Sequence, residues 1–130
     1  MFCLSAIFAC SNDYDIKGTW VSIEEDSISK YVRVQTFYED NVWKANDTVF
    51  FYGPKGTHSM PITSTGTWEQ NGDLVSILMN SIKAEHATAS VENDAEKQSF
   101  KITESSSKRI KWFNIRDTDK KIVVLNKKEN

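Results

Sequence analysis

Apolar and polar residues alternate with a period of two along most of the chain. The segment 31–38 shows this most clearly, with Val32 and Val34 interleaved between Arg33 and Gln35. A period of two is that of a β-strand, because successive side chains point to opposite faces of a sheet. We therefore expect strands over 16–23, 31–38, 48–52, 62–69, 74–79, 85–91, 98–103, 109–115 and 121–126.

Turn signals lie between these strands. Asn71-Gly72 is a strong hairpin signal, and polar clusters occupy 104–107 and 116–119. Short strands at intervals of roughly ten residues are typical of an all-β barrel or sandwich. We predict an antiparallel up-and-down β-barrel of eight or nine strands. Long loops are expected at 40–47 and 53–61, and only 81–96 has room for a short helix.

Composition agrees with a single globular domain. The 130 residues are 39% hydrophobic and 26% charged, which excludes a disordered chain. A net charge of −2 gives no reason to expect a nucleic-acid partner, and we expect a monomer. Acidic residues gather near the start and basic residues near the end. This asymmetry either marks a partner surface or reflects pairing of the two ends. We expect pairing, because the first and last strands of a closed barrel are neighbours.

The N-terminus has the pattern of a targeting segment. Residues 2–9 are apolar and uncharged, too short for the ~20 residues that span a bilayer but suited to a signal peptide. The run ends at Ala9-Cys10, and a polar stretch follows at once. This resembles a bacterial lipoprotein signal. The resemblance implies that 1–9 is removed, that Cys10 is acylated, and that 10–15 tethers a domain spanning 16–130 to the bacterial cell envelope, at the periplasmic face or the cell surface. The alternative is a buried N-terminal strand or a tail without a targeting role.

The tripeptide Gly-Thr-Trp occurs twice, at 18–20 and 66–68. The first copy resembles the Gly-x-Trp that opens the first strand of lipocalins, and the second resembles a mid-barrel hairpin of small bacterial lipocalin-like domains. The resemblance implies that Trp20 closes one end of the barrel beneath a basic side chain, for which Arg109 and Arg116 are candidates. The alternative is that both tryptophans pack in a generic β core.

No catalytic or metal-binding motif is visible in the sequence. His58, expected in a solvated loop, and His86 lack the spacing of zinc ligands, and both cysteines, Cys3 and Cys10, lie at the extreme N-terminus. The acidic run 24–26 is either a cation site or a solvated turn. We therefore expect a protein that is not an enzyme and that has no metal and no cofactor.

The interior of the barrel decides between two functions. A barrel of ~8 strands is either packed by its side chains or holds one small ligand. We expect the ligand cavity, if present, to be lined by Phe37, Phe51, Trp68 and Trp112, with polar groups from Thr63, Thr65, Thr67, Ser76, Thr88 and Ser90. An open cavity of several hundred Å³ favours a membrane-tethered binding protein for a small, mostly apolar ligand. A filled interior favours an envelope protein-interaction module of the inhibitor or immunity type.

Overall fold

The protein is described here by a computed structural model that covers residues 15–84, 87–90 and 97–128. All regular structure in these residues is β. The strands are β2 (Gly18–Glu25), β3 (Ser29–Phe37), β4 (Val42–Gly53), β5 (Gly56–Asn71), β6 (Leu74–Ala84), β7 (Ala87–Ser90), β8 (Lys97–Ser105), β9 (Arg109–Asn114) and β10 (Val123–Lys127).

The strands form a closed antiparallel barrel. Their order is β5-β4-β3-β2-β10-β9-β8-β6-β7, and β5 also pairs with β6, which closes a ring of eight strands and leaves β7 outside it on β6. Strands adjacent in sequence are adjacent in space around this ring, apart from the β7 branch. The predicted up-and-down β-barrel is therefore confirmed, and it is consistent with a lipocalin-like fold.

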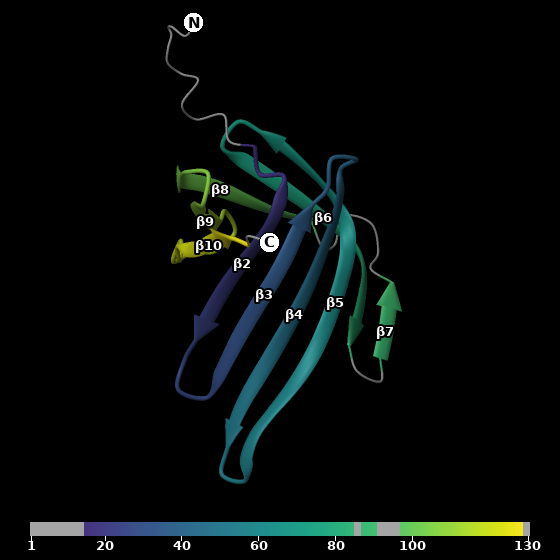
Figure 1. Ribbon diagram of the computed structural model, residues 1–130, viewed down its shortest axis with the longest axis vertical. Coiled ribbons are helices and arrows are strands. Elements are labelled where there is room, and N and C mark those ends of the chain that lie inside the picture. Colours follow the sequence, from purple (N-terminus) through teal and green to yellow (C-terminus); the bar gives the residue numbers. More distant parts are fainter. Residues whose placement is uncertain (1–14, 85–86, 91–96, 129–130) are drawn as a thin grey trace, which may run out of the picture.

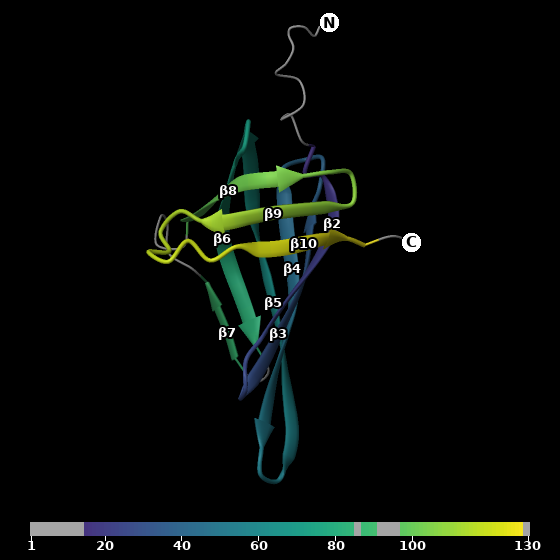
Figure 2. The same ribbon diagram turned by 90° about the vertical axis from the view of Figure 1, so that its left-hand side faces the viewer.

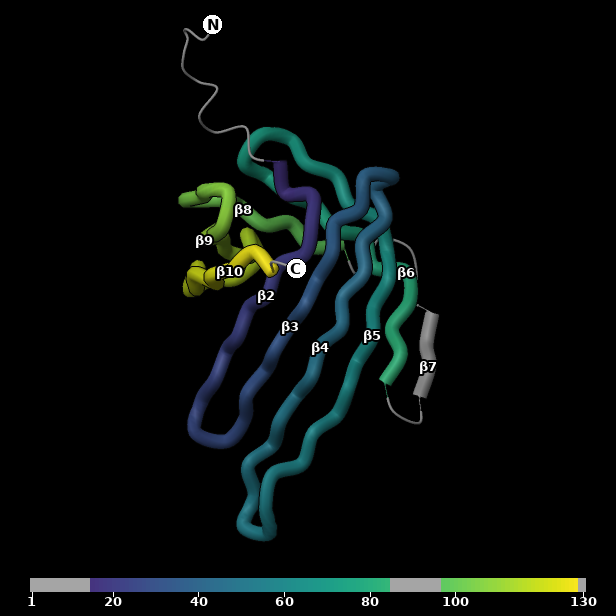
Figure 3. Tube along the Cα trace, viewed as in Figure 1, coloured from purple at the N-terminus to yellow at the C-terminus, as the bar shows by residue number. Residues whose placement is uncertain are grey.

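The barrel is much longer on one side than on the other. Strands β4 and β5 run most of the length of the molecule and β2 and β3 a shorter part of it, whereas β8, β9 and β10 cross them near one end (Figures 1 and 2). The hairpins β2–β3 and β4–β5 project beyond that crossing layer, and β2 begins at the opposite end of the molecule (Figure 3). The molecule thus has a closed end, where β8, β9 and β10 cross the sheet formed by β2 to β5. At the open end the hairpins of that sheet continue beyond these three strands.

The predicted turns at 71–73 and 116–119 are present, but the two predicted long loops are not. β4 and β5 pair continuously from Val42↔Thr67 to Gly53↔Gly56, so 42–53 and most of 53–61 are strand, and His58 lies in β5. Gly56, with φ +119°, permits the tight turn that joins them. The prediction was wrong because polar residues such as Lys44 and Asp47 obscured a regular alternation. Within 81–96, residues 81–84 and 87–90 are also strand, and no helix lies in that part that is described.

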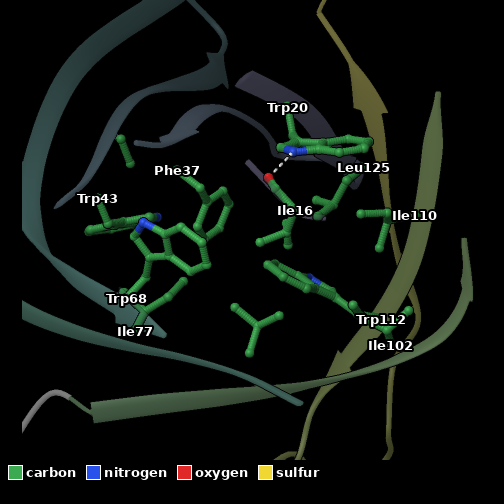
Figure 4. Packing of buried hydrophobic residues seen from close by; sticks show 12 residues of the cluster. Ile16, Trp20, Phe37, Trp43, Trp68, Ile77, Ile102, Ile110, Trp112 and Leu125 are labelled. Carbon is green, nitrogen blue, oxygen red and sulfur yellow. Dashed lines mark hydrogen bonds between the residues drawn. The ribbon is translucent and has the colours of Figure 1, made fainter. Parts of the chain in front are cut away.

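The hydrophobic core fills the closed end. Twelve buried apolar residues form one cluster: Ile16, Trp20, Phe37, Trp43, Ala45, Trp68, Val75, Ile77, Ile102, Ile110, Trp112 and Leu125 (Figure 4). Phe37 makes edge-to-face contacts with Trp68, at 5.4 Å between centroids, and with Trp112, at 6.4 Å. Aromatic pairs in this geometry stabilise the fold by more than the apolar area that they bury accounts for.

The first and last strands meet, as the charge pattern predicts. The seam between β2 and β10 is short, with Val21↔Asn126 and Trp20↔Lys127 as register partners. Just before β10, Lys121 forms an ion pair with Glu24 of β2 at 3.0 Å. The register pairs stop at Val21, so residues 22–25 of β2 do not pair with β10.

Candidate functional site

Three of the four predicted cavity aromatics lie in the barrel interior, but they are packed. Phe37, Trp68 and Trp112 are 1%, 6% and 3% exposed, Phe37 packs against both tryptophans, and of the three only Trp112 also lines the mouth cavity described below. The fourth, Phe51, is 47% exposed and lies near the tip of the β4–β5 hairpin, opposite His58. The assignment of Phe51 to the cavity was wrong, because β4 extends past the barrel and carries Phe51 out of the closed section.

Trp20 is buried at the seam, and a lysine covers it. The indole is 1% exposed, and its Nε1 donates a 2.8 Å hydrogen bond to the carbonyl of Ile16 (Figure 4). The ammonium of Lys127 lies 4.6 Å from the ring centroid, in cation–π geometry. Arg109 and Arg116 are both exposed, so neither of these candidates is the basic side chain that covers Trp20.

The two Gly-Thr-Trp glycines are required for different reasons, Gly18 by its positive φ and Gly66 by the close approach of a neighbouring backbone. At Gly18, with φ +117°, an added Cβ would collide with the end of the Lys127 side chain. At Gly66 it would collide with the backbone of Leu78 and Met79, where the β5–β6 register shifts at a bulge. The missing Cβ leaves room for the Lys127 side chain at Gly18 and for the β6 backbone at Gly66.

A cavity of about 180 Å³ remains at the open mouth of the barrel. One wall is polar and comes from β2 and β3, and the facing wall comes from β8, β9 and β10. The lining residues are Ser22, Glu24, Tyr31, Arg33, Gln35, Gln98, Phe100, Trp112, Asn114, Val123 and Leu125. The cavity is smaller than the usual ~300–1,000 Å³ of ligand sites, so it suits only a small ligand or one part of a larger one.

The polar wall is organised by a buried ion pair. Arg33 donates to both carboxylate oxygens of Asp47, from Nε at 3.0 Å and from Nη2 at 2.9 Å. The Tyr31 hydroxyl donates to the same carboxylate at 2.5 Å and accepts from Arg33 Nη2 at 3.0 Å. The side chains of Arg33 and Asp47 are 19% and 2% exposed. Residues Arg33 and Asp47 are register partners on β3 and β4, so the sheet itself sets this geometry.

The network fixes the charge states of its members. Burial raises the pKa of the Tyr31 hydroxyl to about 12, and the bond to Asp47 acts in the same direction, so Tyr31 is a neutral donor. Burial acts to lower the pKa of Arg33, but the hydrogen bond and charge of Asp47 outweigh it and raise that pKa overall. Arg33 and Asp47 thus form a paired, formally neutral unit.

Gln35 is the buried polar group that points at the cavity. Its side chain is 2% exposed, and its Oε1 accepts a 3.0 Å hydrogen bond from Trp43 Nε1. Within the described residues its Nε2 makes no hydrogen bond, and the same holds for Gln98 and for Asn114 Nδ2, which line the same space. In the described part of the chain the sealed-in side-chain polar atom without a partner is Ser105 Oγ, so these amide groups reach the open cavity and are available to a ligand or to water.

The threonines expected in the cavity face outward instead. Ser64, Gly66 and Trp68 are the buried positions of β5, which puts Thr63, Thr65 and Thr67 on the outer surface. Thr65 bonds Ser81 across the sheet at 2.6 Å, and Ser76 likewise bonds Ser99 at 3.2 Å. The side chains of Thr88 and Ser90 are outside the described part of the structure. The true polar wall was missed, although alternation in 31–38 already placed Tyr31, Arg33 and Gln35 on the same face as Phe37.

The acidic run 24–26 ends strand β2 and opens the turn to β3. Asp26 Oδ1 accepts hydrogen bonds from the backbone N–H of Ile28 at 2.9 Å and of Ser29 at 2.8 Å, and these bonds lower the pKa of Asp26. Glu24 pairs with Lys121, and the hydroxyl of Tyr52 donates to Glu25. Among the described residues, no group of three or more His, Cys, Asp or Glu is placed to hold a metal ion.

Two larger hollows lie outside the barrel, over β5 and β6. They measure about 370 and 470 Å³ and share Glu69, Ser76 and Lys97. Glu69 and Ser76 are register partners that alternate with the buried Trp68 and Ile77, so these hollows open on the outer face of the sheet. Neither of these two hollows therefore opens into the barrel interior.

The fold and the mouth cavity together define a small up-and-down β-barrel with a packed closed end and a polar pocket at its open end. No known protein-family model matches the chain, and no curated protein matches it either. Of the residues described, none belongs to a helix long and apolar enough to cross a membrane. The predicted signal segment 1–9, Cys10 and all but the last residue of the tether 10–15 lie outside the described residues.

Proposed function

We propose that this protein is a non-enzymatic binding protein, tethered to a bacterial envelope membrane through Cys10, that holds a small ligand in the mouth of its barrel. The observation that carries the proposal is the pocket at the open end. It places the Gln35 amide on the β2–β3 wall and the Gln98 and Asn114 amides on the β8–β10 wall, around the apolar surface of the second wall. A few convergent polar groups among apolar walls are the usual make-up of a small-molecule site.

The ligand lies between two unlike walls. Phe100 stacks on Trp112 with centroids 4.4 Å apart, and Val123 and Leu125 continue this apolar surface. A ligand whose body is mostly apolar packs on that wall, and its polar end reaches the β2–β3 side. The volume of about 180 Å³ restricts the enclosed part to a short chain or a single ring.

Two measurements test this proposal. Native mass spectrometry of protein purified from its source should show a small molecule that copurifies. Titration with a panel of fatty acids, retinoids and haem-like compounds should reveal at least one compound that quenches tryptophan emission, because Trp112 lines the cavity. A Phe100→Ala variant should bind more weakly, whereas Phe51→Ala, at the hairpin tip, should bind like the parent protein. The proposal fails if no compound copurifies and none of the compounds changes the emission.

A second function is favoured by the hairpin tips. The side chains of Ile28, Phe51 and Tyr52 are 68%, 47% and 39% exposed. The backbone N–H of Tyr52 donates a 2.9 Å hydrogen bond to the carbonyl of Ile28, which links the two hairpins. Exposed apolar side chains gathered at one end of a molecule are a common mark of a protein interface. Because β2 starts at the opposite end, an anchor before it leaves these tips free to reach an envelope partner (Figure 1).

Cross-linking in intact cells tests this second function. A protein partner should be captured by the parent chain and lost in an Ile28→Ser/Phe51→Ser variant. Tyr38→Ser, which alters another exposed aromatic residue just after the opposite end of β3, is the matched control. If the tip variant captures the same partners as the parent, the tips are not the interface.

A further inference from the structure

The charges around the mouth cavity cancel, and this bears on the chemistry of the ligand. Two charged side chains line the cavity, Arg33 and Glu24. Arg33 is neutralised by Asp47 through two hydrogen bonds, and Glu24 by Lys121 at the rim through an ion pair of 3.0 Å. The cavity therefore presents hydrogen-bonding groups but no unpaired charge.

Arginine in a ligand pocket usually suggests a carboxylate ligand, since its fork-like donors match two oxygens. Here the Nε–Nη2 edge of the Arg33 guanidinium, which would bind such a carboxylate, is already occupied by Asp47. Nε and Nη2 both donate to Asp47, and Nη2 also donates to Tyr31, so only Nη1 remains for another partner. A ligand carboxylate would have to compete with Asp47, whose side chain is only 2% exposed and is held by three hydrogen bonds.

An anion in this cavity would leave water without gaining a free countercharge. Moving an ionised group into such a site is strongly unfavourable unless it is paired. An uncharged hydroxyl or amide group loses much less hydration and can both donate and accept. Gln35 Nε2 and Asn114 Nδ2 offer amide donors to such a group, and the Gln98 amide offers both a donor and an acceptor.

We propose that the ligand's polar end is an uncharged hydrogen-bonding group, a hydroxyl or a primary amide, and that the site discriminates against carboxylate and ammonium groups. This inference rests on the proposed ligand-binding function. It goes beyond that function because it states which polar group of a ligand the cavity accepts and names the Arg33–Asp47 pair as the reason. Asp47 is on this view a specificity determinant, because it occupies the arginine that would otherwise attract an anion.

Matched compounds test the inference on the full-length chain produced without acylation. Octanol, octanamide, octanoate and octylamine share one chain, and benzyl alcohol, benzamide, benzoate and benzylamine share one ring. Calorimetric titration should give affinities for the alcohol and amide at least about tenfold tighter than for the acid or amine on either body. If octanoate or benzoate binds as tightly as its alcohol, or if either amine does, the inference is wrong.

An Asp47→Asn variant provides the converse test. It removes the countercharge of Arg33 while keeping the shape of the side chain, so carboxylate binding should strengthen about tenfold while alcohol binding changes little. Asp73→Asn, which removes a carboxylate from the exposed pair with Lys101, should leave both affinities unchanged. An Asp47→Asn protein that is folded by circular dichroism and shows no gain for carboxylates contradicts the inference. The comparison of compounds on the parent chain decides the question if this variant does not fold.

The outcomes separate this inference from the ligand-binding function. If no compound of either series binds and nothing copurifies from the source, the ligand-binding function itself fails. If compounds bind but the charged members bind as well as the neutral ones, binding stands and only the assignment of neutral polar chemistry is overturned.

Discussion

Lys127 and Trp20 face each other across the seam that closes the barrel. The Lys127 ammonium lies 4.6 Å from the centre of the indole ring and donates a 2.7 Å hydrogen bond to the carbonyl of Lys17. The seam has only two register pairs, so these contacts supplement a short ladder of backbone bonds. The same lysine occupies the space that Gly18 leaves free by having no Cβ.

Truncation of Trp20 should therefore destabilise the barrel strongly. We expect Trp20→Ala to lower the free energy of unfolding by ~3–5 kcal/mol, the usual range for a large buried aromatic. Lys127→Met keeps an unbranched apolar stem but loses the cation, and it should cost about 1 kcal/mol. Urea denaturation measures both values, with the exposed Lys128→Met as the control. An unchanged urea midpoint for Trp20→Ala would show that this residue is peripheral.

Gly66 should tolerate no side chain. An alanine there would press its Cβ against the Leu78 carbonyl at the β5–β6 bulge, which forces the two backbones apart. We expect Gly66→Ala to cost roughly 1–3 kcal/mol or more, as overpacking does elsewhere. Gly53→Ala is the matched control, because its Cβ would make only an ordinary 3.5 Å contact with Gly56. Thermal unfolding followed by circular dichroism compares them, and equal melting temperatures would contradict this reading of the bulge.

The Arg33–Asp47 pair should be costly to break but not to replace. Asp47→Ala leaves a mostly buried guanidinium unpaired, and we expect a loss of ~3–5 kcal/mol in unfolding free energy. The double variant Arg33→Met/Asp47→Leu removes both charges together and should recover most of that loss. For the exposed pair, Asp73→Ala should cost no more than ~1 kcal/mol. If the double variant is as unstable as Asp47→Ala, the penalty does not come from the unpaired charge.

Tyr31 should make the protein sensitive to high pH. Its pKa is raised to about 12 by burial and by Asp47, from an ordinary value near 10. The folded state therefore holds the Tyr31 proton after the unfolded chain has released it, so stability is full below pH ~10 and falls as pH rises towards ~12. Allowing for solvent screening, the loss is at most about 2 kcal/mol.

Denaturation at a series of pH values measures this loss. Tyr31→Phe should flatten the decline, whereas Tyr38→Phe, at an exposed position, should leave it in place. The exposed Tyr52, whose pKa is raised by its bond to Glu25, acts in the same direction in all three proteins. A Tyr31→Phe profile identical to the parent would contradict the assignment.

The anchor prediction concerns Cys10. A Cys10→Ala protein cannot be acylated, and two acyl chains are about what stable membrane attachment needs. We expect the variant to leave the membrane fraction, while Cys3→Ala, which alters the other cysteine, should remain membrane-bound. Fractionation of expressing cells followed by immunoblotting distinguishes them. Continued membrane association of Cys10→Ala would exclude the lipoprotein interpretation.

The alternation of residues determined the fold class and most of the strands. Asn71-Gly72 located one turn correctly, because Gly72 takes the positive φ of +65° that such a turn requires. The failures came where polar residues lie in strands. Segment 42–53 was predicted to begin as a loop because Lys44, Asn46 and Asp47 carry polar side chains. One of these, Asp47, is buried by its partner on the neighbouring strand, and a single segment does not reveal that partner.

The sequence by itself therefore determined an all-β meander, the burial of the Gly-Thr-Trp tryptophans and the pairing of its oppositely charged ends. Only the tertiary structure decided which polar residues face inward. A period of two assigns the residues of a strand to two faces, but it does not say which face is buried. In β6 a bulge also switches which positions face inward partway along the strand. Likewise, only the packed interior showed that Trp68 and Trp112 fill the barrel, because the free space left inside depends on how side chains from distant strands meet.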